Sequence, residues 1–203
     1  KGIKDAGNII AFLFIIAASF RVIEDTGALS AGVFKAVRAF GHRGHLLIPA
    51  SMFLFSLGGF TFGMSEECII FVPIGVAVAQ KMGYDRLTGA SMVSMGALAG
   101  FTAGILNPFS VAISQGLAEL PIFSGWEFRI AIYFALMLSG IAYVSWYAAR
   151  VKKNPELSYM KDVTMEEEHV KKEDIIEMTN RHILVLLTVV AGFAFIIYGV
   201  IKK

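Results

Sequence analysis

Three long, mainly apolar runs limit what this chain can fold into more than any other feature. They span 6–23, 128–149 and 182–201 and hold few charges. A helix needs roughly 20 mainly apolar residues to cross the hydrocarbon core of a bilayer. A composition of 56% hydrophobic residues and a mean hydropathy of +0.67 also exceed what a soluble domain can bury. The sequence therefore predicts an all-α membrane protein with transmembrane helices in these three runs.

Several chemistries find no support in the sequence. Cys68 is the one cysteine, so no intrachain disulfide can form, and no paired Cys or His spacing indicates a metal site. We expect no enzymatic activity, no catalytic residue, no metal centre, no cofactor and no nucleic-acid partner. The start has no initiator Met, basic n-region or small-residue cleavage site. We therefore expect an internal piece of a longer protein instead of a chain that opens with a signal peptide.

The polar stretch 150–181 sets the expected orientation. It is rich in Lys and Glu, and loops rich in basic residues lie on the cytoplasmic side of a membrane. With this segment as a cytoplasmic polar loop, the helix at 127–149 runs inwards and 182–203 begins the following transmembrane region. We therefore expect a multi-pass protein of the cell inner (cytoplasmic) membrane.

The first part of the chain, 1–149, predicts a helix at 6–23 and then a helix at 28–40 that lies in the membrane plane. Lys35 and Arg38 would face one side of this second helix and apolar residues the other. An amphipathic helix of this kind suits the interface between lipid and water.

The run 45–80 is flanked by basic residues at both ends, so both ends should lie on the same side of the membrane. Two full spans would need roughly 40 residues plus a turn, and this run is a little short for that. Glycines 58, 59 and 63 at its centre permit a sharp turn. We favour a re-entrant hairpin over two full spans.

Glu66 and Glu67 follow the centre of this run and would lie near membrane depth in a hairpin. A central acidic residue costs about 2.5 to 3.5 kcal/mol on insertion scales, so such groups are expected to have a partner or a function. The two carboxylates need not share one role, because adjacent residues on a helix point in different directions. The alternative is that they cap an external turn between two short spans.

The run 87–120 predicts a discontinuous helix. Gly96, Gly100 and Gly104 form a smooth face that lets another helix approach closely. Pro108 removes a backbone donor and pushes Asn107 out of helical geometry, so the helix should break there. Broken backbone at membrane depth is tolerated only where it is buried in protein or lines a cavity. The break therefore indicates a cavity.

A hairpin with a polar tip followed by a broken helix is the arrangement with which secondary transporters build a site near the bilayer midplane. Asn107 is the strongest candidate contact for a substrate or cation, followed by Ser110. Ser114 and Gln115 read more readily as residues that satisfy nearby backbone groups.

Four stretches also carry a family resemblance. They are "IPASMFLFSLGGFTFGMSEE", "MGYDRLTGA", "GILNPFSVAISQGLAELPIFSGWEFR" and "ARVKKNP". Together they resemble the YfcC-like carriers, described as basic amino-acid antiporters, which are related to DcuC-type anaerobic carriers of four-carbon dicarboxylates within the ion transporter superfamily. The resemblance runs from about residue 6 to residue 155.

The resemblance implies one repeat of an inverted-repeat carrier, with the chain as the N-terminal half. Its partners would be a small-molecule substrate, membrane lipid, the second repeat of the same carrier and a second copy in a homodimer. The substrate or ion site would take residues from the hairpin motif and the broken-helix motif. These are Gly63, Ser65, Glu66 and Glu67 from the first and Asn107, Pro108 and Ser110 from the second.

The negative charges of Glu66 and Glu67 give a further indication of the substrate class. Two carboxylates beside a cavity favour a cationic or zwitterionic substrate or a coupling cation, because like charges repel strongly in a low dielectric. Basic amino acids of the arginine or ornithine type are therefore the first expectation, with Na⁺ near Asn107 or H⁺ as the coupling ion. A four-carbon dicarboxylate is the alternative. A membrane-embedded enzyme that uses the Glu pair and a non-transporting membrane scaffold are remote alternatives.

Overall fold

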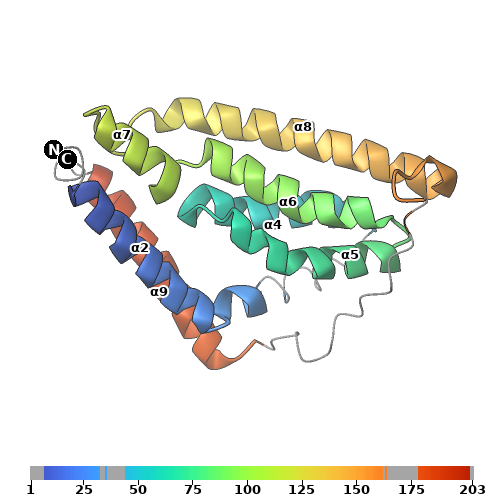
Figure 1. Cartoon of the computed structure of the whole chain (residues 1–203), viewed down its shortest axis with the longest axis horizontal. Helices are drawn as coiled ribbons and strands as arrows, with labels where there is room; N and C mark the ends of the chain where they lie inside the picture. The colour runs from blue at the N-terminus through green and yellow to red at the C-terminus, as the bar shows by residue number, and fades with distance from the viewer. Residues whose placement is uncertain (1–6, 33–34, 36–43, 162, 164–177, 202–203) are drawn as a thin grey trace.

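The computed structural model describes the chain apart from residues 1–6, 33–34, 36–43, 162, 164–177 and 202–203 (Figure 1). All regular structure in the described residues is helical, which confirms the predicted all-α class. The α-helices are α2 (Gly7–Asp25), α4 (Gly44–Phe62), α5 (Val72–Lys81), α6 (Arg86–Ala103), α7 (Ile113–Leu117), α8 (Trp126–Lys153) and α9 (Asn180–Ile201). The shorter segments are the 3-10 helices η1 (Glu66–Phe71) and η3 (Pro155–Leu157) and the π-helix η2 (Pro108–Ala112).

Two helical stretches in the described part of the chain are long and apolar enough to cross a membrane. They are Arg86–Leu117, with 32 residues, and Trp126–Lys153, with 28 residues. The second contains the predicted span 128–149. The predicted run 182–201 lies within α9, a helix of 22 residues. Length and composition thus support a membrane protein, as the sequence predicts.

Helices α4 and α6 run in parallel with their backbones in direct contact. Their glycines make this approach possible, because a Cβ at Gly100 would overlap the carbonyl oxygen of Ser56. The close contacts pair Gly96 with Met52, Gly100 with Ser56 and Gly104 with Phe60. Each step is four residues on both helices, so one face of α6 follows one face of α4 over two turns. The predicted smooth glycine face is therefore confirmed, and its partner is α4.

Helix α5 returns antiparallel to α4 and packs on α6 through a second pair of glycines. A Cβ at Gly75 would lie 2.8 Å from the carbonyl oxygen of Gly89, and a Cβ at Gly89 would overlap the backbone of Val76. The stretch predicted as a hairpin therefore does leave and return to one end of the bundle.

Helix α8 runs antiparallel to α4 and α6 and covers them (Figure 1). The Ser56 hydroxyl and the Tyr133 hydroxyl form a buried hydrogen bond of 2.6 Å between α4 and α8. Met52, Met92 and Met137 fill the core between α4, α6 and α8, with almost no exposed surface. Four helices, α4, α5, α6 and α8, thus form one packed bundle.

The extents of three predicted segments differ from the described helices. Helix α8 continues beyond 149 to Lys153, so the predicted polar loop begins in helix; basic side chains in a last turn interact favourably with the helix dipole. The predicted in-plane helix at 28–40 is described at 28–32, which is helical, and at residue 35. The rest of it, and residues 164–177 of the polar loop, lie outside the described residues.

Candidate functional site

The connection between α4 and η1 turns the chain at a left-handed glycine. Gly63 has a φ of 77°, a conformation that glycine adopts without the strain of a Cβ. The next residue, Met64, donates its N–H to the carbonyl oxygen of Gly58 at 3.2 Å and so closes the end of α4. The glycine-rich tip predicted from the sequence therefore forms a tight turn at residues 63–65.

The two adjacent carboxylates occupy different environments after this turn. Glu67 is partly buried, and its Oε2 accepts a hydrogen bond from the backbone N–H of Ser65 at 3.0 Å. Glu66 is exposed. Both lie in the first turn of η1, where negative charge is favourable to a helix N-terminus. Locally the bond from Ser65 N–H to Glu67 agrees with the capping of the alternative interpretation, and the two carboxylates have different surroundings.

The break in the long apolar helix falls at residues 104–107, directly before the proline. Asn107 has 0% exposed surface and an extended ψ of 111°. Its Oδ1 accepts hydrogen bonds from the backbone N–H groups of Phe109 at 2.9 Å and Ser110 at 3.2 Å. Its Nδ2 donates to the carbonyl oxygen of Phe101 at 3.3 Å. One buried amide therefore bridges both sides of the break and confirms the predicted discontinuity.

The chain resumes after the break as a π-helix. The N–H of Ala112 donates to the carbonyl oxygen of Asn107 at 3.3 Å, a bond across five residues. Single π-helical turns inside α-helices occur frequently at functional sites. Pro108 at the first position of η2 has no N–H to leave unsatisfied, so it suits this start.

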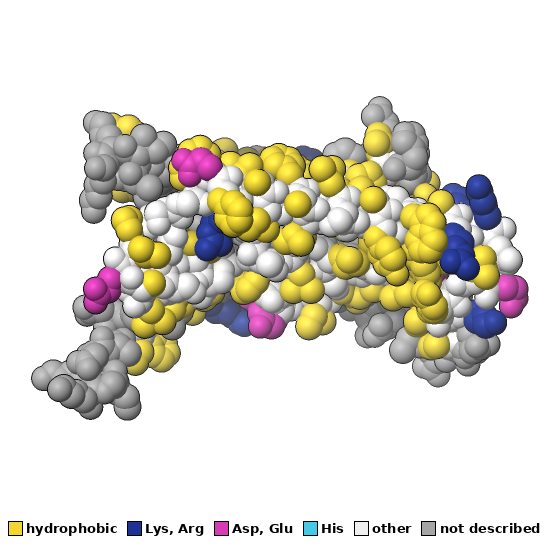
Figure 2. Space-filling model, turned by 90° about the horizontal axis from the view of Figure 1, so that it is seen from above, with side chains coloured by type: hydrophobic (Ala, Val, Ile, Leu, Met, Phe, Trp, Pro, Cys, Tyr) yellow, Lys and Arg dark blue, Asp and Glu magenta, His cyan; other side chains and the backbone are white. Residues whose placement is uncertain are grey.

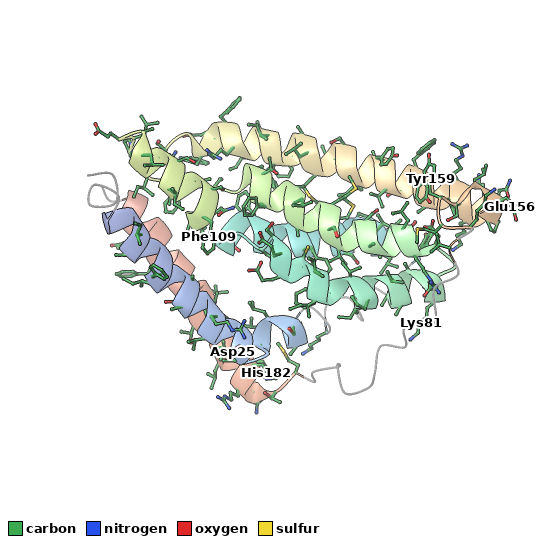
Figure 3. All side chains as sticks on the ribbon, viewed as in Figure 1. Asp25, Lys81, Phe109, Glu156, Tyr159 and His182 are labelled. Carbon is green, nitrogen blue, oxygen red and sulfur yellow. The ribbon has the colours of Figure 1, made fainter. Side chains whose placement is uncertain are left out.

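The turn and the break touch each other. A Cβ at Gly63 would lie 2.7 Å from Asn107 Oδ1 and 2.9 Å from Cδ2 of Phe109, so the glycine backbone packs directly on both residues. Figure 3 shows Phe109 at the end of the bundle opposite Lys81 and Tyr159. Two motifs about 40 positions apart in the sequence therefore form one junction at this end.

Four helix ends converge at this junction. Helices α4 and α6 end there, and η1 and η2 begin there. Helix C-termini carry partial negative charge and unsatisfied carbonyls, and N-termini carry partial positive charge and unsatisfied N–H groups. Paired helix ends of this kind are the means by which transporters bind ions and polar substrates without placing many charged side chains in the membrane.

The remaining polar residues near the break divide into two kinds. The Ser110 hydroxyl is buried without a hydrogen-bond partner. Gln115 instead holds the following turn, because its Nε2 donates to the carbonyl oxygen of Ser124 at 2.8 Å and its Oε1 accepts from the N–H of Phe123. Gln115 is thus a structural residue, as the sequence indicates, and Ser110 retains an unused polar group at the junction.

A polar cluster at the opposite end of the bundle was missed by the sequence analysis. Asp85 caps α6, where Oδ1 accepts from the N–H and hydroxyl of Thr88 at 2.9 and 2.6 Å. Its Oδ2 accepts from the hydroxyls of Tyr147 at 2.6 Å and Ser158 at 2.7 Å. The local signal for the cap was present, since Asp three residues before Thr at a helix start is typical of an N-cap. The partners 62 and 73 positions away gave no sequence signal.

The Asp85 cluster ties three parts of the chain together. Partial burial acts to raise the pKa of Asp85, but the hydrogen bonds from Thr88, Tyr147 and Ser158 outweigh it and hold the pKa of this carboxyl below its ordinary value of 3.8. The rings of Tyr147 and Tyr159 stack with centroids 5.6 Å apart. The charged carboxylate therefore fastens the end of α8 and the segment that follows it to the start of α6.

Comparisons with known proteins find a family and relatives that match nearly the whole chain. The chain matches the protein family described as DcuC, C4-dicarboxylate anaerobic carrier, over residues 1–203. It is 34% identical over 201 residues to a protein of Escherichia coli (strain K12) named "Putative basic amino acid antiporter YfcC", a match covering 97% of this chain and 39% of that protein. It is 29% identical over 205 residues to an uncharacterized protein of Haemophilus influenzae, covering 98% of this chain and 40% of that protein. No solved structure matches the chain.

Helical structure throughout the described residues, with two candidate membrane spans and an interrupted helix, is consistent with a membrane transport protein. The chain belongs to the DcuC family of carriers, which confirms the resemblance. It spans about two fifths of the length of the curated relatives it matches, 39% and 40%.

Proposed function

We propose that this chain forms part of a secondary active transporter of the cytoplasmic membrane and supplies one half of its substrate site. The site is built at the turn 63–67 and the break 104–110. The observation that carries this proposal is the packing of Gly63 directly on Asn107 and Phe109, which brings four helix ends to one point. The family to which the chain belongs supports transport over catalysis.

The N–H groups at the helix N-termini are already hydrogen-bonded, which favours a cation over an anion as the ligand at this junction. The N–H groups at the start of η2 are already bonded to Asn107 Oδ1, and the Ser65 N–H before η1 is bonded to Glu67. Of the last carbonyls of α6, that of Phe101 accepts from Asn107 Nδ2. The other last carbonyls of α4 and α6 have no intrahelical partners as a rule, which favours positive charge at the junction. Exposed Glu66 adds a full negative charge. A basic amino acid, or a coupling Na⁺ near Asn107, fits this electrostatic field.

The substrate class follows from this reasoning and from the relatives. We propose small amino acids of the arginine or ornithine type, exchanged or coupled to Na⁺ or H⁺. The E. coli relative's name as a basic amino acid antiporter supports this class. The family description, C4-dicarboxylate anaerobic carrier, favours a second candidate, transport of four-carbon dicarboxylates with a cation bound first to offset the carboxylates.

A counterflow assay separates these two substrates. The full-length carrier is reconstituted in proteoliposomes loaded with one unlabelled compound, and entry of a labelled one is followed. Arginine and ornithine should drive labelled arginine inwards, whereas succinate and fumarate should not. Exchange of dicarboxylates alone would establish the second candidate. A labelled compound that emerges chemically changed would support an enzyme instead.

The carboxylates are tested by a matched pair of substitutions. Glu66→Gln should abolish uptake while the carrier still assembles, because the exposed carboxylate is the one free to meet a cation. Glu67→Gln should reduce uptake less, because its amide oxygen still accepts from Ser65 N–H. Full activity of both Glu66→Gln and Asn107→Ala would defeat the assignment of the site.

We also propose that the turn at 63–65 lies inside the membrane as a re-entrant tip. The paired return of α4 and α5 to one end supports this placement. A cysteine placed at Ser65, in a Cys68→Ala background, should react with an impermeant thiol reagent, and substrate should protect it. Ready reaction from outside only, unaffected by substrate, would favour two full spans and an external turn.

The chain spans only 39% and 40% of the length of its two relatives, so a carrier of their length would contain further parts that contact it. We propose that the second repeat of the same carrier completes the site, and that the full protein forms a homodimer in the lipid bilayer. A full-length carrier truncated after residue 203 should bind and transport nothing, whereas coexpression with the remaining part should restore uptake. Uptake by the truncated chain alone would contradict a site shared between two repeats.

A further inference from the structure

A mainly apolar groove lies on the outer face of α6 and α8 and runs from Thr102, close to the break in α6, towards the Asp85 end. Its volume is about 480 Å³. It lies on the two helical stretches that are long and apolar enough to cross a membrane. The lining residues are Met95, Leu98, Ala99 and Thr102 from α6 and Leu136, Ser139, Gly140 and Tyr143 from α8. In a carrier where these two stretches cross the bilayer, a groove on their outer face would be open to lipid.

The polar group in the α8 wall is internally satisfied. The Ser139 hydroxyl donates to the carbonyl oxygen of Leu136 at 3.0 Å, as serines in apolar helices commonly do. Gly140 presents only backbone to the groove, and a Cβ there would lie 3.2 Å from the side chain of Met52 in the core. These features make the floor of the groove suitable for a hydrocarbon chain.

Beyond the groove, the cationic side chain of Arg150 lies on the same face of α8, a face called the stripe below. Positions 136, 139, 143, 146 and 150 recur at steps of three and four residues, so they share one helix face. At the end of this stripe Arg150 lies over the ring of Trp146, 5.5 Å from its centroid, and the rings of Trp146 and Tyr143 are 5.9 Å apart. All three side chains are exposed. Figure 2 shows hydrophobic side chains along the middle of this face and Lys and Arg gathered at one end.

The spacing between groove and cation matches one leaflet of a bilayer. Gly140 and Arg150 are ten residues apart, about 15 Å along a helix that rises 1.5 Å per residue. A hydrocarbon core is about 30 Å thick, so each leaflet contributes about 15 Å. Aromatic residues and Arg characteristically sit at the headgroup level. An acyl chain that follows the groove would thus place its headgroup beside Arg150.

We propose that this groove is a binding site for an anionic phospholipid, with one acyl chain between α6 and α8 and the phosphate paired with the Arg150 guanidinium. Trp146 and Tyr143 form the wall at the level of the glycerol backbone. The charge at one end and the apolar floor together select a lipid with a negative headgroup over a neutral one. The site is separate from the proposed substrate site at the other end of the bundle.

The test uses the full-length carrier purified in detergent, with phosphatidylglycerol as the probe and phosphatidylcholine as the neutral comparison. Retained lipid is counted by native mass spectrometry. Arg150→Gln should weaken phosphatidylglycerol binding about fivefold, because one basic residue near a membrane surface is worth about that much. Phosphatidylcholine binding should change little. Arg150→Lys should retain most of the preference.

Ser139→Leu, which fills the groove from α8, should reduce binding of both lipids. Leu98→Ser removes an exposed apolar wall residue and gives the same readout if Ser139→Leu fails to assemble. Lys161→Gln is the matched control, an exposed cation near the same end that is not on the stripe. Unchanged lipid binding in Arg150→Gln and in the groove variants would overturn the proposal. A crosslink between cysteines at position 139 of two copies would overturn it in favour of a dimer interface.

Discussion

The two ends of the helical bundle are held in opposite ways. At the Asp85 end, a charged carboxylate accepts four hydrogen bonds from three parts of the chain. At the junction end, the backbone is interrupted twice and one neutral amide, Asn107, connects the pieces. The first end is fixed by side chains that converge on a charge. The second depends on close backbone packing around Gly63.

This difference shows where the molecule can bind a ligand. A fully bonded carboxylate with a lowered pKa has no capacity left for a substrate. Interrupted helices leave polar backbone groups that must be satisfied by protein, water or a bound ligand. The Ser110 hydroxyl, buried without a partner, lies at the junction end. We therefore expect substitutions at the two ends to separate transport from stability.

Among substitutions that compare the two ends of the bundle, the largest effect is expected from Asn107→Ala. The change leaves two N–H groups and the Phe101 carbonyl without their partner in a fully buried position. Uptake by the full-length carrier should fall at least about 100-fold, a change of roughly 2.7 kcal/mol in the activation barrier. The control is Asn154→Ala, because Asn154 caps η3 in the same way but is exposed at the other end. Equal losses in both variants would remove the distinction between the two ends.

A smaller effect is expected from alanine at the two left-handed glycines. Gly63 and Gly83 both have a φ of 77°, so each alanine carries a similar backbone strain of about 1 kcal/mol. At Gly83 the nearest side-chain atom is 3.7 Å from the added Cβ, whereas at Gly63 the Cβ would lie 2.7 Å from Asn107 Oδ1. Gly63→Ala should therefore lower uptake about tenfold, as 1.4 kcal/mol would do, and Gly83→Ala should leave it within about twofold. Similar uptake in the two variants would show that the close contact has no functional role.

At the opposite end, Asp85→Ala should lower stability more than transport. The substitution removes a helix cap and leaves the Tyr147 and Ser158 hydroxyls without their acceptor, which should cost about 2 kcal/mol. The melting temperature of the full-length carrier in detergent should fall, while uptake per folded molecule stays above half. Loss of uptake without loss of thermal stability would make Asp85 part of the transport mechanism.

The smallest effect is a pH dependence. The pKa of Asp85 is lower in the folded protein than its ordinary value of 3.8, so the folded state favours the ionised form. The resulting stability is complete above the ordinary pKa and is lost as the pH falls through the lower folded value. The difference in melting temperature between the wild type and Asp85→Asn should therefore shrink below about pH 4. A constant difference from pH 7 to pH 3 would contradict the assigned role of the charge.

The sequence predicted the local features well, because each rests on a short-range rule. Pro108 removes a donor and so breaks the helix. Three glycines four residues apart create a face without side chains, and α4 packs there. The glycine-rich tip turns at Gly63 for the same kind of reason, since only glycine adopts that backbone angle without strain.

The features that depend on distant partners could not be predicted. Nothing in the sequence indicates that Tyr147 and Ser158 both donate to Asp85. The sequence allowed the two glutamates different roles but did not indicate which would be buried: Glu67 bonds to the backbone and Glu66 is exposed. Their division of roles depends on how η1 begins after the turn.

By itself, the sequence determined that this chain is helical and apolar enough for a membrane, where it turns and where it breaks. These properties follow from composition, from proline's missing donor and from glycine's missing side chain, which act within a few residues. Only the tertiary structure decided that the turn at Gly63 packs on Asn107 and that the far end closes on Asp85. The physical reason is that packing brings together residues many positions apart, and their contacts depend on the relative placement of whole helices.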